Sequence, residues 1–177
     1  MNFDNANCDS ALRNPRRLEA LYSSHLLDST PDRILDGLTK IICRELNVPI
    51  ALVCIVDAER QFFKAQHGLP PELVRQRGTS IDYSLCKYVV EQHSTIAIDD
   101  ARKIPALENH PAVAERGIVA YLGAPLVAKG QVLGSVCAVD EKPRHWSEKE
   151  IRAIEKRANF IRSELDFHWE QTRKFGT

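Results

Sequence analysis

The chain lacks a long uninterrupted hydrophobic segment. Its longest apolar runs, Pro49 to Val56 and Ile118 to Ala128, are much shorter than the roughly 20 residues that a membrane-spanning helix needs. The N-terminus carries acidic residues where a signal peptide has basic ones, and no apolar segment follows them. These absences predict a cytoplasmic protein that is not embedded in a membrane.

An excess of charge of either sign is also missing. Lysine and arginine together number 24, as do aspartate and glutamate, so the formal net charge is zero. No overall field attracts a nucleic acid or an anionic membrane surface to such a chain. We therefore expect neither as a partner.

Paired cysteine motifs are absent too. The sequence has no CxxC, and its odd number of cysteines excludes complete intramolecular pairing. We expect reduced thiols, most of them small buried hydrophobic side chains. No His or Cys pair has metal-ligand spacing, and no Walker loop or glycine-rich ATP lid is present. The sequence predicts no metal site and no output machinery of its own.

The length of 177 residues suits one compact domain. Residues 1–13 are polar and show no periodicity, which predicts a flexible leader, and the domain is expected over 14–168 with a helix end or tail over 169–177. Asn14-Pro15 and Thr30-Pro31-Asp32 are typical helix starts, and each precedes apolar residues at helical spacing. Two N-terminal amphipathic helices are therefore expected.

Apolar and β-branched runs predict two hairpins and a short extra strand. Residues 84–92 are expected to form a short helix, and 68–83 and 99–117 are expected to be loops. Loops as long as 99–117 often cover a binding site. The expected strands are 49–57, 61–67, 95–98, 118–128 and 131–140.

Ser147 and Glu150 form a capping box that opens a long C-terminal helix. Apolar residues then recur at alternating spacings of three and four, a heptad pattern that favours contact with a partner helix. We expect this stripe to form a homodimer interface, and packing on the chain's own sheet stays open as the alternative. The residues are Ile151, Ile154, Ala158, Ile161 and Leu165.

Six short segments follow one another in an order typical of a known family. They are Arg60–Ala65 with Gly68-Leu69, Ser84–Cys86, Asp99–Arg102, Tyr121–Leu126, Leu133–Asp140, and Pro143-Arg144 with Trp146-Ser147. Together they span about residues 16 to 166 and resemble the GAF domain family, in particular the bacterial signalling subgroup that precedes histidine kinase or diguanylate cyclase domains. The resemblance implies an α+β fold with a central antiparallel sheet, N- and C-terminal helices on one face, and cap loops and short helices on the other.

The resemblance also implies a small-ligand cavity under the cap. Polar groups converge on strand ends and on the cap loop of an otherwise apolar region, as a small-ligand site requires. Simpler roles remain open: Asp99 and Asp100 suit turn capping, and His110 suits a solvated surface position. The expected ligand-binding residues are Phe63, Cys86, Asp99, Asp100, His110, Tyr121, Cys137 and Asp140.

The sequence favours a ligand-responsive regulatory module that relays binding through its terminal helices to a signalling partner or an output domain outside the chain. The ligand and any cofactor are unknown, and no haem or bilin signature is present; Lys87 stands where bilin-binding GAF domains usually place a histidine after the attachment cysteine. One alternative is a free methionine sulfoxide reductase, although 99–117 lacks the attacking cysteine of that family. Another is a ligand-free dimerisation platform whose cavity is filled by its own side chains.

Overall fold

Apolar and β-branched residues build two hairpins at the centre of a single sheet. The first joins β1 (Ile50–Val56) to β2 (Arg60–His67), and the second joins β5 (Ala120–Ala128) to β6 (Gln131–Asp140). The structure, a computed structural model, describes the backbone of residues 3 and 5–175 and the side chains of residues 3 and 7–165. Both hairpins lie where the sequence predicts them.

The two hairpins meet through β1 and β6 in the middle of the sheet. Short strands β3 (Gly78–Ser80) and β4 (Ile96–Ile98) form the edges, in the order β3-β2-β1-β6-β5-β4. Every neighbouring pair is antiparallel. The predicted α+β fold with a central antiparallel sheet is confirmed.

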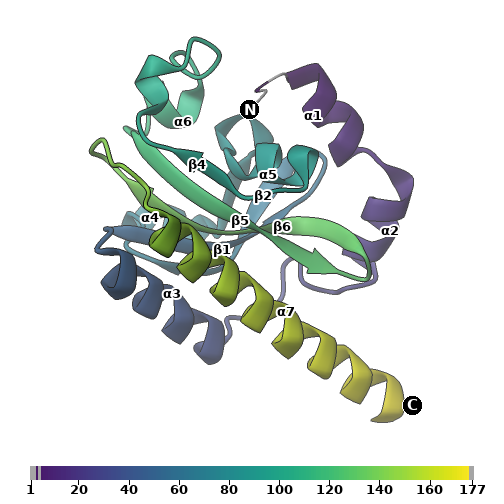
Figure 1. Cartoon of the computed structure of the whole chain (residues 1–177). Helices are drawn as coiled ribbons and strands as arrows, with labels where there is room; N and C mark the ends of the chain where they lie inside the picture. The colour runs from purple at the N-terminus through teal and green to yellow at the C-terminus, as the bar shows by residue number, and fades with distance from the viewer. Residues whose placement is uncertain (1–2, 4, 176–177) are drawn as a thin grey trace.

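Helices α3 (Arg33–Leu46) and α7 (Glu148–Phe175) cover one face of this sheet (Figure 1). The Asp32 side chain caps α3 by accepting from the backbone of Ile34 and Leu35 at 2.8 and 3.2 Å. The predicted capping box opens α7: Ser147 Oγ accepts from the Glu150 backbone, and Glu150 Oε2 accepts from that of Ser147. Both helix starts therefore lie where the capping residues predict them.

The heptad stripe of α7 packs against the chain's own sheet. Ile154, Ala158, Ile161 and Leu165 are buried in one core with Leu122 and other residues of β5. Ile151 lies partly buried at the edge of the same core. The assignment of this stripe to a dimer interface is thus corrected, because an apolar side chain buried within the monomer cannot also cover a second copy. Spacing alone does not distinguish these two partners.

The opposite face of the sheet carries the cap, which we define as residues 68–92 and 99–118. It contains α4 (Pro71–Gln76), α5 (Cys86–Gln92) and α6 (Pro111–Ala114), with 3-10 turns at Ile81–Tyr83 and Ala101–Lys103. The expected loop 68–83 is wrong, because it holds α4, β3 and a 3-10 turn. Each of these elements is too short to show a repeating pattern.

The N-terminal residues also differ from the prediction. The expected flexible leader contains α1 (Asn5–Leu12), which packs on α5 and buries Cys8 and Leu12. Among the described side chains of α1, Cys8 and Leu12 are the buried ones, about one per turn, which is too few to give the sequence an amphipathic pattern. This helix lies on the cap face of the sheet, opposite α3 and α7.

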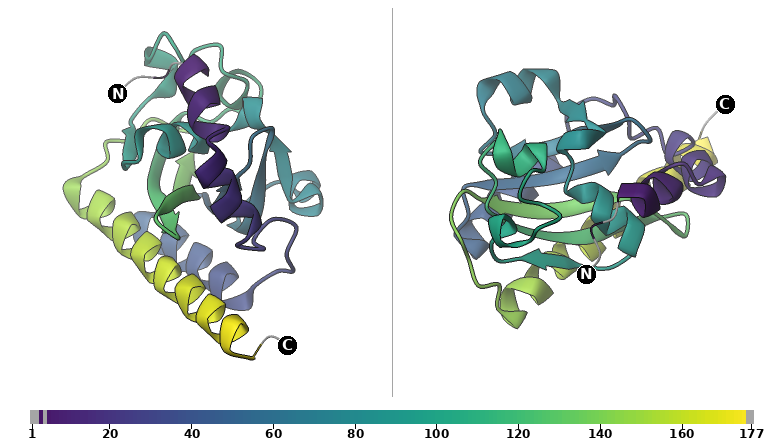
Figure 2. Two further views of the ribbon diagram at one scale, coloured as in Figure 1. Left: turned by 90° about the vertical axis from the view of Figure 1, so that its right-hand side faces the viewer. Right: turned by 90° about the horizontal axis from the view of Figure 1, so that it is seen from above.

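Helix α2 (Pro15–Tyr22) connects this leader to the sheet. Asn14 caps it, as predicted, by accepting from the Arg16 backbone at 3.0 Å. Arg17 is buried and donates to the carbonyls of Leu12 and Val56, both at 2.7 Å. Figure 2 shows α1 and α2 following one another along one side of the molecule. A single buried guanidinium therefore ties the end of α1 to the end of β1.

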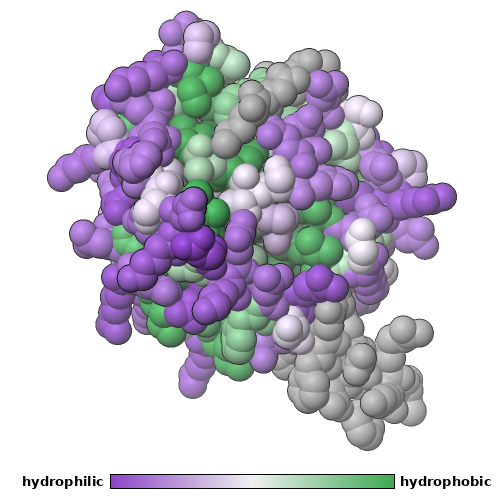
Figure 3. Space-filling model, viewed as in Figure 1, coloured by the Kyte–Doolittle hydropathy of each residue, from purple (hydrophilic) through white to green (hydrophobic). Residues whose placement is uncertain are grey.

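Hydrophilic residues dominate the face shown in Figure 3, with smaller hydrophobic areas between them. No helix within the described residues is long and apolar enough to cross a membrane. The tail expected over 169–177 lies outside the residues whose side chains are described, although the α7 backbone continues to Phe175.

Candidate functional site

A cavity of about 140 Å³ lies between the sheet and the cap. At roughly 30 Å³ per water in the liquid, this is the space of four or five water molecules, and it is smaller than the roughly 300–1,000 Å³ of most ligand pockets. Apolar side chains form most of its wall. They are Ile50, Leu52, Phe63, Leu69, Leu73, Leu85, Ile118 and Val139.

Three thiols from three elements come together at the floor of this cavity. Cys86 begins α5, Cys137 lies on β6 and Cys54 on β1, and all three are buried and free. The Cys86 and Cys137 sulfurs are 3.8 Å apart. Cys54 donates to Gln61 Oε1 at 3.3 Å. Cys86 and Cys137 line the cavity itself.

Cys86 is the acceptor of this cluster. The Tyr121 hydroxyl donates to its sulfur at 3.4 Å and lies 3.3 Å from Ser135 Oγ. Contacts with the Cys137 and Cys54 thiols lower the pKa of Cys86 against the effect of burial, with smaller contributions from Ser135 and Tyr121. The same contacts and burial raise the pKa of Cys54 and of Cys137. Cys86 is therefore the first of the three to become a thiolate.

Tyr121 reaches Cys86 because Gly123 leaves room for its ring. The two residues point to the same side of β5, and a Cβ atom at position 123 would lie 2.2 Å from the Tyr121 hydroxyl. The phenol is buried, and desolvation raises its pKa, so it stays a neutral donor. The glycine in the Tyr-Leu-Gly segment thus fixes the orientation of a residue of the site.

Gln61 holds the cavity wall where β2 meets β3. Its amide donates to Thr79 Oγ1 at 2.7 Å and to the Tyr83 carbonyl at 3.4 Å. The Arg116 guanidinium lies 5.3 Å from the centre of the Tyr83 ring, and Glu141 lines the same cavity. The cavity lining therefore includes an amide, the Tyr83 phenol and one side chain of each charge.

Four of the eight residues expected to bind a ligand line this cavity. They are Phe63, Cys86, Tyr121 and Cys137. Asp99, Asp100 and Asp140 do not line it, and their carboxylates have structural partners. Asp99 accepts from the Trp146 backbone at 3.2 Å, Asp100 pairs with Arg102 at 2.9 Å, and Asp140 pairs with Arg144 at 2.7 Å. These three aspartates therefore cap turns or form ion pairs, and the prediction that they bind a ligand is corrected.

His110 lies neither in the cavity wall nor on the surface. It is 7% exposed, and its Nδ1 caps α6 by accepting from the Ala112 backbone at 3.2 Å. Its Nε2 is buried and has no hydrogen-bond partner within the described residues. Burial, with a smaller effect of Lys87, lowers the pKa of His110 to about 4. The residue is a buried neutral cap, so both expectations for it are corrected.

Sequence reasoning missed the polar residues of the wall. Gln61, Thr79, Tyr83, Arg116 and Glu141 lie in five separate segments, and only the fold brings them together. One signal was available for Gln61, because it stands two residues before Phe63 on a strand and so shares its face.

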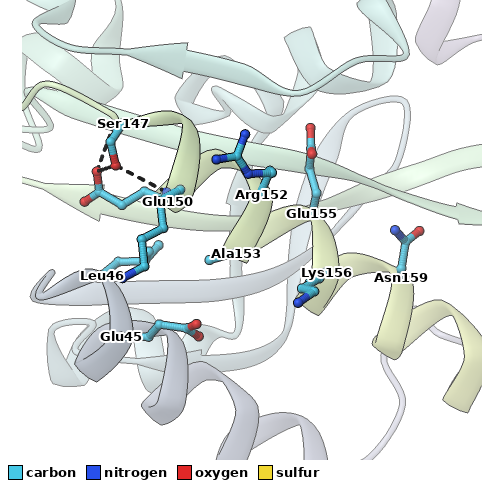
Figure 4. Close-up of a pocket in the computed structure, with 10 residues that line it drawn as sticks. Glu45, Leu46, Ser147, Glu150, Arg152, Ala153, Glu155, Lys156 and Asn159 are labelled. Carbon is cyan, nitrogen blue, oxygen red and sulfur yellow. Dashed lines mark hydrogen bonds between the residues drawn. The ribbon is translucent and has the colours of Figure 1, made fainter.

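A wider groove lies between α3 and α7, on the other face of the sheet (Figure 4). Its walls carry Glu45, Lys149, Arg152, Glu155 and Lys156 among others. Several of these charges are already paired: Arg152 with Glu148 at 3.0 Å, and Glu45 with Arg157 at 2.8 Å. We regard this groove as the solvated junction of two helices.

Fold and site together define a class of small α+β domain, in which one sheet carries a helical layer on one face and a capped cavity on the other. The model of the GAF domain family matches residues 30–165, most of the 177. The chain belongs to the GAF domain family.

One similar protein is the cyclic di-GMP phosphodiesterase PA2567 of Pseudomonas aeruginosa, which is 30% identical over 143 residues. The match covers 79% of this chain but only 24% of that protein, so this chain spans about a quarter of its relative's length. The similarity therefore concerns one part of the phosphodiesterase.

Solved structures share the fold at low sequence identity. The GAF domain of an Acinetobacter phosphoenolpyruvate-protein phosphotransferase is 17% identical, with a TM-score of 0.66 over 93% of this chain and 98% of that one. The free methionine-R-sulfoxide reductase of Neisseria meningitidis, solved with its substrate, is 15% identical, with a TM-score of 0.61 over 85% and 88%. A domain of a phosphotransferase and a reductase therefore share this fold, and the fold alone does not determine the function of this chain.

Proposed function

We propose that this chain is a ligand-responsive regulatory module of bacterial signal transduction, which binds a small molecule in the capped cavity. One observation carries the proposal: the sheet that forms the cavity floor carries α3 and α7 on its opposite face. Membership of the GAF family and the similarity to part of a bacterial signalling enzyme support it.

The size and chemistry of the cavity limit the ligand. A space of about 140 Å³ suits a compact metabolite, and a cyclic dinucleotide or a bilin requires the cap to move outward. Apolar walls with Gln61, Tyr83, Arg116 and Glu141 favour a molecule that has both an apolar part and a polar group.

Strand β5 is the proposed route from the cavity to α7. Tyr121 faces the cavity, while its neighbours Ala120 and Leu122 face the core that contains Ile154 and Ile161. Neighbouring residues of a strand point to opposite faces of the sheet. A ligand that displaces Tyr121 therefore also moves Ala120 and Leu122 in the core that contains the α7 side chains. We propose that the output belongs to another domain or another chain.

An enzymatic role as a free methionine sulfoxide reductase has less support. Residues 99–117 contain no cysteine. Thiol chemistry in this chain would have to come from the floor of the cavity instead.

The test is equilibrium dialysis of the purified protein against a bacterial metabolite extract, read by mass spectrometry. Leu69 lies at the cavity wall and is partly exposed at the edge of the cap-side core, so Leu69→Trp is expected to narrow the cavity. Val74, on α4 but outside the wall, provides the matched control Val74→Trp.

We expect at least one metabolite to be enriched with the wild type and with V74W, and at least tenfold less with L69W, roughly the effect of 1.4 kcal/mol. Equal enrichment with L69W would place binding outside the cavity. An absence of enrichment with the wild type would contradict the proposed function.

A further inference from the structure

Three of the five cysteines gather at one point of the molecule, although the sequence contains no paired motif. Cys54, Cys86 and Cys137 come from β1, α5 and β6, whereas Cys43 lies on α3 across the sheet and Cys8 on α1. All five are free. Cysteines that serve only as small buried hydrophobic side chains do not have to be neighbours. The proximity of these three thiols therefore points to a chemical role.

Cys86 and Cys137 have the geometry of a pair that can be joined. Their sulfurs are 3.8 Å apart, and a disulfide needs about 2.05 Å, so closure requires a movement of about 2 Å. Cys54 is held differently, because its thiol donates to Gln61 Oε1. Cys54 also contacts Cys86, but the Cys137 thiol has no such hydrogen bond to an amide within the described residues, so we take Cys137 as the partner that closes on Cys86.

An oxidant has a path to this pair. Both cysteines line the cavity, which has room for several water-sized molecules. Hydrogen peroxide is of that size. Cys86 is 3% exposed and Cys137 0%, so a peroxide inside the cavity meets Cys86 first, and Cys137 lies behind it.

The surroundings of Cys86 stabilise a thiolate. The Tyr121 hydroxyl donates to its sulfur, and the Cys137 thiol is in contact with it. Contacts with Cys137 and Cys54, and to a smaller extent with Tyr121, lower the pKa of Cys86, while that of Cys137 is raised. One thiol is therefore the nucleophile and the other remains protonated beside it, which is the division of roles that a two-thiol reaction requires.

We propose that Cys86 and Cys137 form a peroxide-reactive dithiol, in which a hydroperoxide that enters the cavity oxidises the pair to a disulfide linking α5 of the cap to β6 of the sheet. This inference does not rest on the proposed function, since it requires only the two thiols and a cavity that admits a peroxide.

The reaction has two steps. The Cys86 thiolate attacks one peroxide oxygen; an S–O bond forms, the O–O bond breaks, and the departing hydroxide takes a proton, which gives a sulfenic acid and water. Cys137 sulfur then attacks the sulfenic sulfur; the S–S bond forms, the S–O bond breaks, and a second water leaves with the Cys137 proton. Two thiols lose two electrons in total, and the peroxide is reduced to two waters. A small dithiol reverses the reaction by exchange.

The test is titration of the full chain with hydrogen peroxide, followed by differential alkylation and peptide mass mapping. We expect two of the five thiols to be lost together, with a mass decrease of two hydrogen atoms, a mapped Cys86–Cys137 link, and full recovery with dithiothreitol. The wild-type map decides the outcome even if a cysteine variant folds poorly.

Three variants sharpen the result. Cys137→Ser lacks the second thiol, so a dione probe should trap a sulfenic acid at Cys86. Cys86→Ser should lose no thiol at the same peroxide dose. Cys43→Ser is the matched control: this thiol is alone on α3, burial raises its pKa to about 11, and the variant should still lose the Cys86–Cys137 pair.

Other results overturn the proposal. A mapped Cys54–Cys86 link would remove Cys137 from its role, and a link between two chains would show that the reacting thiols lie elsewhere. Retention of all five thiols at a peroxide dose that oxidises free cysteine completely would refute the reaction altogether.

Discussion

The ring of Tyr121 lies along β5 over Gly123, so close that a single methyl group at position 123 would overlap the phenol oxygen. This relationship places the Tyr121 hydroxyl against Cys86 on the cap and beside Ser135 on β6. The position of the Tyr121 side chain at the cavity floor therefore depends on Gly123, which has no side chain.

Gly123→Ala should destabilise the domain, because the new Cβ displaces the Tyr121 ring from a filled core. The expected cost is about 1–3 kcal/mol, measured by urea unfolding. Gly37→Ala is the matched control: Gly37 lies on α3 with open space around it, and alanine there should stabilise by up to about 1 kcal/mol. A neutral G123A would mean that the tyrosine can move at no cost.

Tyr121→Phe should raise the pKa of Cys86, because the thiolate loses its hydroxyl donor. The Tyr121 contact is a smaller cause of the lowered pKa than the contacts with Cys137 and Cys54, so the profile should move to higher pH without losing the preference for Cys86. The pH profile of Cys86 modification by a small methanethiosulfonate reagent measures the shift. Tyr22→Phe, which removes an exposed hydroxyl bonded to Asp57, should leave the profile unchanged.

His110 should make the fold sensitive to mild acid. Its pKa is lowered to about 4 in the folded state, against about 6.5 in the unfolded chain. Above pH 6.5 the residue is neutral in both states; as the pH falls toward 4, only the unfolded chain takes up the proton, so stability is lost. The loss should be of the order of 2 kcal/mol.

His110→Asn keeps a side chain that can cap α6 but cannot titrate in this range, so stability should decline less between pH 6.5 and 4. Urea unfolding at several pH values provides the comparison. His145→Asn, at a side chain 91% exposed, should keep the wild-type pH dependence. If H110N lost as much stability as the wild type between pH 6.5 and 4, other groups would be responsible for the acid sensitivity.

Arg144 should contribute more to stability than an ordinary surface arginine. Its guanidinium donates to the carbonyls of Leu46 and Asn47 at the end of α3 and pairs with Asp140. Arg144→Ala removes all three contacts, for a loss of about 2–3 kcal/mol. Arg152→Ala, which breaks an exposed pair with Glu148, should cost less than about 1 kcal/mol.

Ile154→Ala tests the packing of α7. The side chain is fully buried against the sheet, so its truncation should cost about 2–5 kcal/mol with no change in oligomeric mass. Phe160→Ala, at an exposed position of the same helix, should change stability little. Loss of an oligomer on mutation of Ile154, with monomer stability unchanged, would restore the interface interpretation.

The sequence by itself determined the local elements and the family. Both hairpins, the caps at Asn14, Asp32 and Ser147, and the long C-terminal helix follow from short-range patterns, since capping and strand alternation involve residues close together in the chain. Six spaced segments identified the GAF fold because each is a local turn or strand motif.

Only the tertiary structure determined which groups the key side chains contact. The α7 stripe has the same spacing whether it meets a second copy or its own sheet, and Asp99, Asp100 and Asp140 look alike whether they bind a ligand or a neighbouring residue. Cys86 and Cys137 are 51 residues apart and meet only when α5 packs on β6. Local chemistry shows which groups a chain carries, but long-range packing determines which of those groups remain available to a ligand or an oxidant.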